Sequence, residues 1–165
     1  MSRDVVKWTI QILQIEGFYI MQIYLAAPFF SDEQVDRVAR IEAALEANPT
    51  VTNFYSPRHH QKTDNPEYTP AWAAEVFRRD VTQVLDADAL VVVADFRDDD
   101  ADSGTAFEAG MAWALKKPII MVEETDYKTN LMLTESLTAF VNKAEDLATY
   151  DFKNYPESKF EGQLF

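Results

Sequence analysis

Apolar and polar positions alternate along the chain in blocks that predict strands and helices in turn. Short apolar runs have the length of strands, whereas longer segments repeat apolar residues every three or four positions, as amphipathic helices do. The strands are expected at 19–25, 51–55, 89–94, 119–122 and 137–141. The helices are expected from a cap at Ser31 to Asn48, and over 71–86, 103–117 and 143–150. This alternation, with apolar central strands, predicts an α/β protein with a parallel sheet.

Local signals mark the ends of the predicted helices. Ser31 and Gln34 form the pattern of a capping box, in which the serine hydroxyl accepts from a first-turn amide and the glutamine reaches back. Pro49 ends the first helix. The helix over 71–86 carries an apolar side made of Trp72, Val76, Phe77, Val84 and Leu85.

The first 18 residues follow this pattern less clearly. Apolar residues alternate with others at Val6, Trp8, Ile10 and Ile12. Three interpretations stay open for this extension: an added edge strand, a helix, or a poorly ordered arm. Residues 19–165 contain no repeat and no linker, so we expect them to form a single domain.

Composition narrows the class of protein. A chain of 165 residues has the length of one domain, and 47% hydrophobic residues exclude a disordered chain. Without cysteine there is no disulfide, no thiolate zinc site and no cysteine nucleophile. The net charge of −13 disfavours nucleic acid and anionic membranes as partners. With no signal peptide or apolar span visible, we expect a cytoplasmic protein acting on a small neutral or cationic molecule.

Candidate chemistry is expected where the strands end, because open parallel sheets bind ligands beyond the carboxyl ends of their strands. Asp80 places a carboxylate between Phe77 and Val84, inside the apolar stripe of its helix. An ion pair with Arg78 or Arg79 is the alternative, but adjacent helical residues do not face each other. We therefore expect a functional carboxylate whose pKa is raised by burial.

A second acidic segment follows the most apolar strand. Asp102 or Ser103 is expected to cap the next helix, and Gly104 lets a ligand approach the backbone near Glu108. Alone, Glu108 is an ordinary first-turn glutamate favoured by the helix dipole. Convergence with Asp80 and Asp102 on one predicted strand edge favours a site instead. The acidic run 98–100 lacks the spacing of a calcium loop, so no metal site is expected.

Aromatic residues also lie at a predicted strand end. Tyr24 ends the first strand, and Phe29 and Phe30 follow in the next loop, where they can fill the core or stack on a planar heterocycle. His59 and His60 are adjacent and are expected to be solvated rather than metal ligands. No glycine-rich dinucleotide or Walker motif is present, so neither type of site is expected.

Several segments, in order along the chain, resemble nucleoside 2-deoxyribosyltransferases. The segment from Asp102 through Gly104 to Glu108 and Gly110 is the most specific of them. The others are 23–32, 65–68 ahead of the Asp80 helix, 117–118, 130–132 and 160–165. The resemblance covers about 21–165 and leaves the N-terminal extension outside.

The resemblance implies a doubly wound, five-stranded parallel sheet of the flavodoxin-like or Rossmann-like kind, in three α/β/α layers. It also implies transfer of 2-deoxyribose between nucleobases in nucleotide salvage, through a covalent sugar–enzyme ester and without a cofactor. By position, Glu108 matches the nucleophile and Tyr24 the tyrosine that hydrogen-bonds it. Asp80 matches the acid that handles the proton of the base, and Asp102 the acid that holds the sugar.

The same resemblance implies substrate-binding positions and partners. Gln61 matches a contact to the edge of the base, and Phe29 with Phe30 an aromatic wall. Asn130 and Met132 match a segment lent by a neighbouring chain. The partners implied are 2′-deoxyribonucleosides, free nucleobases and further copies of the chain, in a homo-oligomer such as a hexamer built as a trimer of dimers.

Two further positions bear on the substrate. The chain end reaches the site in this family, which here means the Phe165 carboxylate. Ala26 replaces a glycine found in some relatives, and the loop over 26–30 has no basic residue and no glycine, so a free nucleoside is expected rather than a 5′-phosphate. The loop favours the purine-type relatives. A nucleoside or nucleotide N-glycoside hydrolase and a non-catalytic nucleoside-binding module remain alternatives.

Overall fold

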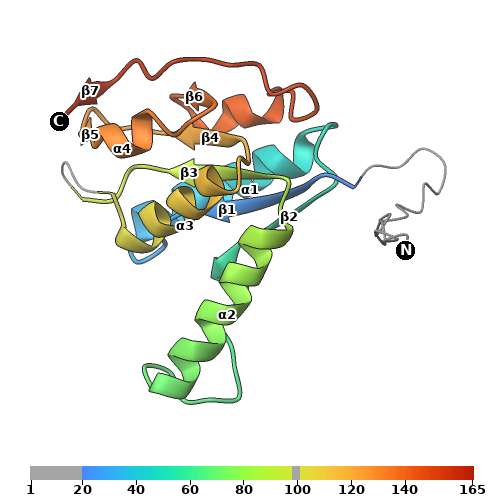
Figure 1. Ribbon diagram of the computed structural model, residues 1–165, viewed down its shortest axis with the longest axis vertical. Coiled ribbons are helices and arrows are strands. Elements are labelled where there is room, and N and C mark those ends of the chain that lie inside the picture. The colour runs from blue at the N-terminus through green and yellow to red at the C-terminus, as the bar shows by residue number, and fades with distance from the viewer. Residues whose placement is uncertain (1–19, 98–100) are drawn as a thin grey trace, which may run out of the picture.

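A five-stranded parallel sheet forms the centre of the protein (Figure 1). The computed structural model describes residues 20–97 and 101–165. The strands of the sheet lie in the order β2-β1-β3-β4-β6, and every neighbouring pair is parallel. Their bounds are Asn53–Tyr55, Gln22–Ala26, Ala89–Val93, Ile119–Val122 and Ala139–Val141. The predicted five-stranded doubly wound fold is confirmed, with the reversal of strand order between β1 and β3.

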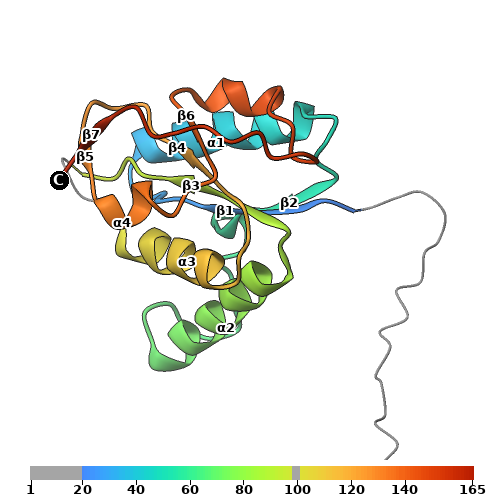
Figure 2. The ribbon, with the colours of Figure 1, turned by 45° about the horizontal axis from the view of Figure 1, so that its top comes forward.

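Helices cover both faces of the sheet (Figure 2). The 3₁₀ helix η2 packs with α1 on one face, and α2 and α3 lie on the other. The bounds of the helices are Asp32–Ala47 for α1, Pro57–His59 for the 3₁₀ helix η1, Pro70–Asp86 for α2, Ser103–Ala114 for α3, Leu131–Thr134 for α4 and Ala144–Ala148 for η2. A two-stranded parallel ribbon, β5 (Lys128–Thr129) with β7 (Gln163–Leu164), ties the chain end to the body.

The sheet separates two apolar cores because successive residues of a strand point to opposite faces. Ile23 and Leu25 belong to the core under α1, whereas Tyr24 and Ala26 belong to the core under α2 and α3. Strand β3 is buried at every position, as a central strand covered on both faces must be. Tyr24, in the middle of β1, therefore points toward the side on which α2 and α3 lie.

Side-chain caps fix where the helices begin. Ser31 accepts from the Gln34 amide, Thr69 from the Trp72 amide and Asp102 from the Thr105 amide. These oxygens satisfy N–H groups that have no partner within their helix. Of the two predicted caps for α3, Asp102 is the one that forms. The Gln34 side chain accepts from the Phe30 amide, one residue before the position that a capping box requires.

Several predicted bounds were wrong. The first strand begins at Gln22 rather than at 19, and β2 begins at Asn53 rather than at 51. α3 ends at Ala114, because Lys116 adopts a positive φ of 58° before Pro118. The helix expected over 143–150 is a short 3₁₀ helix. The interpretations of residues 1–18 and of the acidic run 98–100 lie outside the described residues.

The apolar side expected for the second predicted helix is largely uncovered. Only Val84 is buried in α2, whereas Phe77 is 56% and Leu85 50% exposed. Figure 1 shows the N-terminal part of α2 extending away from the sheet. In the part of the chain that the structure describes, no helix is long and apolar enough to cross a membrane.

Candidate active site

A tyrosine and a glutamate from distant parts of the chain meet beside the sheet. Tyr24, the third residue of β1, donates its hydroxyl proton to Glu108 Oε1 at 2.5 Å. The Tyr24 side chain is fully buried, and Glu108 lies on α3, which packs against β1 and β3. Strand β1 and helix α3 therefore bring together Tyr24 and Glu108, which the sequence predicted to lie at one edge of the sheet.

The protonation of Glu108 is strongly perturbed. The pKa of Glu108 is raised to about 7, chiefly by burial and also by the negative charges of Asp80 and Asp102, while the Tyr24 hydrogen bond lowers it. The pKa of Tyr24 is itself raised far above its ordinary value by burial and by Glu108. Tyr24 therefore stays a proton donor, and Glu108 changes charge near neutral pH.

Asp80 is the second carboxylate of the cluster. Burial raises its pKa, as expected from its place in the apolar stripe of α2. The Tyr55 hydroxyl donates to Asp80 Oδ1 at 3.2 Å and favours the ionised form. Arg79 Nε lies 3.8 Å from the same oxygen, so the expectation that the neighbouring arginines are poor partners was wrong for Arg79. The length of the Arg79 side chain allows this approach, which helical spacing alone does not reveal.

Three rings line this cluster in a stack. The Tyr24 and Tyr55 rings are 5.8 Å apart and nearly parallel, and the His60 ring lies 4.4 Å from that of Tyr55. Tyr55 was not among the residues predicted for the site, Arg79 was considered only as a poor partner of Asp80, and His60 was expected to be solvated. His60 is indeed exposed, but its ring packs on Tyr55. Tyr55 could have been found from the tendency of parallel sheets to bind ligands at the carboxyl ends of their strands, because Tyr55 is the last residue of β2 and pairs with Tyr24 of β1.

Asp102 is the N-cap of α3, the helix that carries Glu108. Its Oδ2 accepts from the Thr105 amide at 2.9 Å and from the Thr105 hydroxyl at 3.2 Å. Asp102 is close enough to raise the pKa of Glu108. A Cβ atom at Gly104 would lie 3.1 Å from Asp102 Oδ2, so a larger residue would press on the cap. The small residue thus leaves Asp102 room at the start of α3.

The other residues expected around the base lie on the loops after β1 and β2. The Gln61 side chain donates to the Pro57 carbonyl at 2.7 Å, so this amide is engaged within its own loop. The Phe29 and Phe30 rings stack at 5.2 Å, and Phe30 meets Phe96 edge-on. Phe30 is 64% exposed, so its ring is open to a planar partner.

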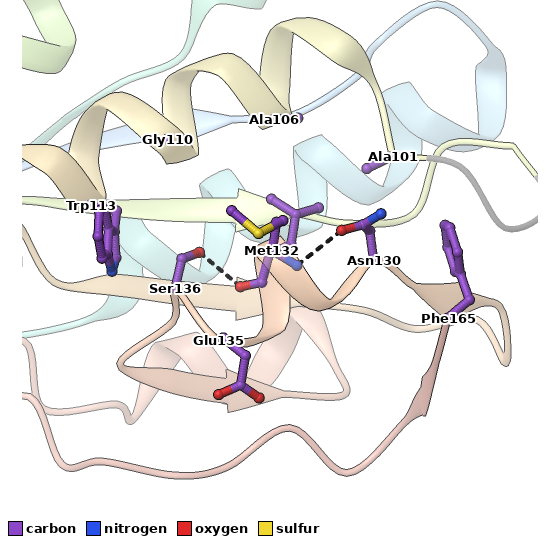
Figure 3. Close-up of a pocket in the computed structure, with 10 residues that line it drawn as sticks. Ala101, Ala106, Gly110, Trp113, Asn130, Met132, Glu135, Ser136 and Phe165 are labelled. Carbon is purple, nitrogen blue, oxygen red and sulfur yellow. Dashed lines mark hydrogen bonds between the residues drawn. The ribbon is translucent and has the colours of Figure 1, made fainter.

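Asn130, Met132 and Phe165 are not in this cluster. They line a separate cavity of about 530 Å³ between α3 and α4, with Gly110 and Trp113 on its other wall (Figure 3). Ala106 also lines it, and Glu108 lies about 200° around the helix axis from Ala106, since each residue turns the helix by about 100°. Within one chain, α3 therefore separates these three residues from Glu108.

The local fold holds this second group of residues in place. Asn130 caps α4 by accepting from the Met132 amide at 2.9 Å, and Met132 is 74% exposed. The Phe165 amide donates to the Thr129 carbonyl, and the Phe165 carbonyl accepts from the Leu131 amide. The chain end therefore lies beside the Asn130 segment. No group of three metal-ligating side chains is assembled within residues 20–97 and 101–165.

The fold and the site place the chain in a class first: it is an α/β protein with two carboxylates of raised pKa close to the switch point of its sheet. A family model described as nucleoside 2-deoxyribosyltransferase matches residues 23–152. The chain belongs to this family and is therefore an enzyme, a transferase. The family acts on nucleosides and nucleobases.

Individual relatives agree with this assignment. A nucleoside deoxyribosyltransferase of Limosilactobacillus fermentum is 33% identical over 149 residues, which covers 82% of this chain and 88% of that protein. The structure of a 2-deoxyribosyltransferase from Bacillus psychrosaccharolyticus has a TM-score of 0.75 and 32% identity, covering 84% of this chain and 98% of that one. A protein from Enterococcus faecalis V583, with a TM-score of 0.65 and 23% identity, covering 79% of this chain and 96% of its own, shares the fold.

Proposed function

We propose that the protein moves 2-deoxyribose from one nucleobase to another by double displacement through a deoxyribosyl ester on Glu108. The observation that carries this proposal is the pair of half-buried carboxylates, each bound by its own tyrosine hydroxyl. Glu108 is the nucleophile, Tyr24 orients it, and Asp80 handles the proton of the base. Asp102 is the residue assigned to hold the sugar.

The chemistry suits the two carboxylates. Cleavage of an N-glycosidic bond builds positive charge on the sugar, which a carboxylate stabilises and can then trap as an ester. In the first half-reaction a Glu108 oxygen bonds to C1′, the C1′–N bond breaks, and its electron pair leaves with the base, which takes the Asp80 proton. In the second half-reaction an incoming base gives a proton to Asp80, bonds to C1′ and releases Glu108 as a carboxylate.

A free deoxynucleoside is the substrate class in this proposal. The loop after β1 runs through Ala27, Pro28 and Phe29 without a basic side chain, so it offers a 5′-phosphate no counter-charge. The exposed Phe30 ring and the Gln61 amide are assigned to the base, with purines as the favoured class. Gln61 must release the Pro57 carbonyl to reach a base.

A neighbouring chain completes the site in this proposal. Asn130, Met132 and Phe165 are exposed, and within one chain they are separated from Glu108 by α3. Large apolar residues of α2 and α3, and of the C-cap of α3, are also exposed: Phe77, Leu85, Phe107, Trp113 and Leu115. An apolar surface of this kind is typical of an interface. A homo-oligomer, such as a trimer of dimers, would cover it.

The activity is tested by incubating the protein with deoxyinosine and adenine. Formation of deoxyadenosine and hypoxanthine, measured by liquid chromatography, supports the transferase. Release of hypoxanthine without deoxyadenosine identifies a hydrolase, and binding without product identifies a non-catalytic module. Intact-protein mass spectrometry with deoxyinosine alone should show one deoxyribosyl group added at Glu108, and Glu108→Ala should lack it.

Site sharing is tested by complementation between two inactive variants. Glu108→Ala and Asn130→Ala chains are purified separately and as a co-expressed mixture. If a neighbour lends Asn130, the mixed oligomer contains some sites with both native residues and recovers part of the activity. If both residues act within one chain, the mixture stays as inactive as its components.

A further inference from the structure

Tyr55 links the two carboxylates of the candidate site. Its hydroxyl donates to Asp80 Oδ1 at 3.2 Å, and its ring packs on that of Tyr24, which holds Glu108. Tyr55 is 8% exposed, and its contact with Asp80 is partly buried. A hydrogen bond between a buried hydroxyl and a carboxylate favours the ionised carboxylate. Tyr55 is thus placed to influence Asp80 without touching Glu108.

The double displacement makes a particular demand on Asp80. The residue must hold a proton when the first base leaves and must be ionised when the second base arrives. Burial alone favours the protonated form, so less Asp80 would be ionised and ready to take a proton in the second half-reaction. A general acid that must also serve as a base works best when neither form is strongly favoured.

We propose that Tyr55 is the positioning residue that lets Asp80 give a proton in one half-reaction and take one back in the other. This inference rests on the proposed function. The hydroxyl stabilises ionised Asp80 and fixes Oδ1, and the ring contacts with Tyr24 and His60 fix the hydroxyl. Tyr55 acts through Asp80 and has no bond-making role of its own.

Other charged and titratable groups also surround Asp80. Arg79 lies 3.8 Å away and, like a protonated His60, favours the ionised form. Across the cluster, Asp80 raises the pKa values of Tyr24 and Glu108. A useful test must therefore report on Asp80 while Glu108 is unable to titrate.

The second half-reaction meets this condition because Glu108 is then an ester. Double-mixing rapid quench first forms the deoxyribosyl-enzyme from deoxyinosine and then adds adenine at a series of pH values. The transfer rate should rise with pH as Asp80 ionises. In Tyr55→Phe the midpoint of that rise should move upward by about one pH unit, the shift expected for losing one hydrogen bond to a charged group.

Tyr150→Phe is the matched control. It removes the same atom from a tyrosine whose hydroxyl donates to the Pro156 carbonyl at 3.2 Å, on the face of the sheet covered by α1. It should leave the midpoint unchanged. Histidines also change charge near neutral pH, so His60→Gln is a second control, in which the rise with pH should persist. The midpoint does not depend on the fraction of folded enzyme.

Two failures are distinguishable. If the wild-type protein forms no deoxyribosyl-enzyme, the proposed function falls. If the wild type transfers normally but Tyr55→Phe keeps the wild-type midpoint, whether its rates are reduced or not, then Tyr55 is a structural residue and this inference is wrong.

Discussion

Helix α3 has two flanks of very different chemistry. On one flank Glu108 sits among Tyr24, Asp80 and Asp102, where polar groups are partly buried and paired. On the other flank Gly110 and Trp113 line an apolar cavity with Met132, which is largely exposed. On the first flank Glu108 and Asp80 both accept hydrogen bonds from tyrosines, whereas the second flank exposes apolar side chains.

The difference follows from what burial does to each kind of side chain. A carboxylate half-buried beside like charges has its pKa raised into the range where proton transfer is useful. An apolar side chain left exposed gains free energy only when another surface covers it. In the proposed function, the first flank therefore performs the chemistry and the second flank serves a neighbouring chain.

Removal of the Glu108 carboxylate should have the largest effect. Glu108→Gln should reduce deoxyribosyl transfer at least about a thousandfold, because an amide cannot form the ester. In the wild type, kcat/KM for the donor should depend on a group with a pKa of about 7, since the nucleophile must be ionised. Glu46→Gln, an exposed change on α1, serves as the control and should keep full activity. Normal turnover in Glu108→Gln would show that this flank of α3 does not perform the chemistry.

Asp80→Asn should have the next largest effect. Loss of a proton donor and acceptor typically costs about a hundredfold or more in rate, so kcat should fall by that amount. The Kd for a deoxynucleoside, measured by calorimetry, should change only a few-fold because the amide keeps the shape of the side chain. Unchanged turnover would mean that Asp80 is a structural residue of α2.

Deletion of Phe165 tests the second flank. The KM for the donor should rise by roughly threefold to tenfold, the size expected for losing one aromatic contact. The kcat should change less, because Phe165 is assigned to substrate binding and to no bond-making or proton-transfer step. Steady-state kinetics of the truncated chain measure both values, and a normal KM would place the tail outside the site.

Substitution of Glu123 should have the smallest effect, and the quantity affected is the free energy of unfolding. Burial raises the pKa of Glu123 to about 7 from its ordinary 4.5, with Asp95 and Asp126 adding to the shift, while the Thr129 hydroxyl donates to it. The folded state thus holds the proton more tightly than the unfolded state, and this contribution to stability is lost as pH rises from about 4.5 through 7. Urea unfolding at pH 5 and pH 8 should show a smaller fall in Glu123→Gln than in the wild type. An equal fall in both would contradict this assignment.

Much of the fold was predictable because its signals are local. The apolar run of β3, the cap before α1 and the proline before β4 each depend on a few neighbouring residues. The β5–β7 ribbon was missed, since it pairs two short segments that carry no periodic pattern of their own. The 3₁₀ form of η2 was missed for a similar reason, because a short apolar spacing does not distinguish it from an α-helix.

The residues of the candidate site likewise divide into those with a local signal in the sequence and those without one. Tyr24, Asp80 and Glu108 were selected because each lies in an apolar stretch or at a predicted strand end, and these features can be seen in the sequence. Tyr55 was missed because its importance comes from a contact with Asp80, 25 residues away in the chain. Arg79 was set aside as a partner of Asp80 because helical spacing does not reveal how a long side chain lies.

By itself, the sequence determined the order of strands and helices and the positions of the acidic residues along them, because hydrophobic periodicity and caps act over one or two turns. Only the tertiary structure decided which carboxylate meets which tyrosine and on which flank of α3 each residue lies. Those outcomes depend on how strands far apart in the chain pair and on how helices rotate against the sheet, and burial then sets the proton affinity of each group.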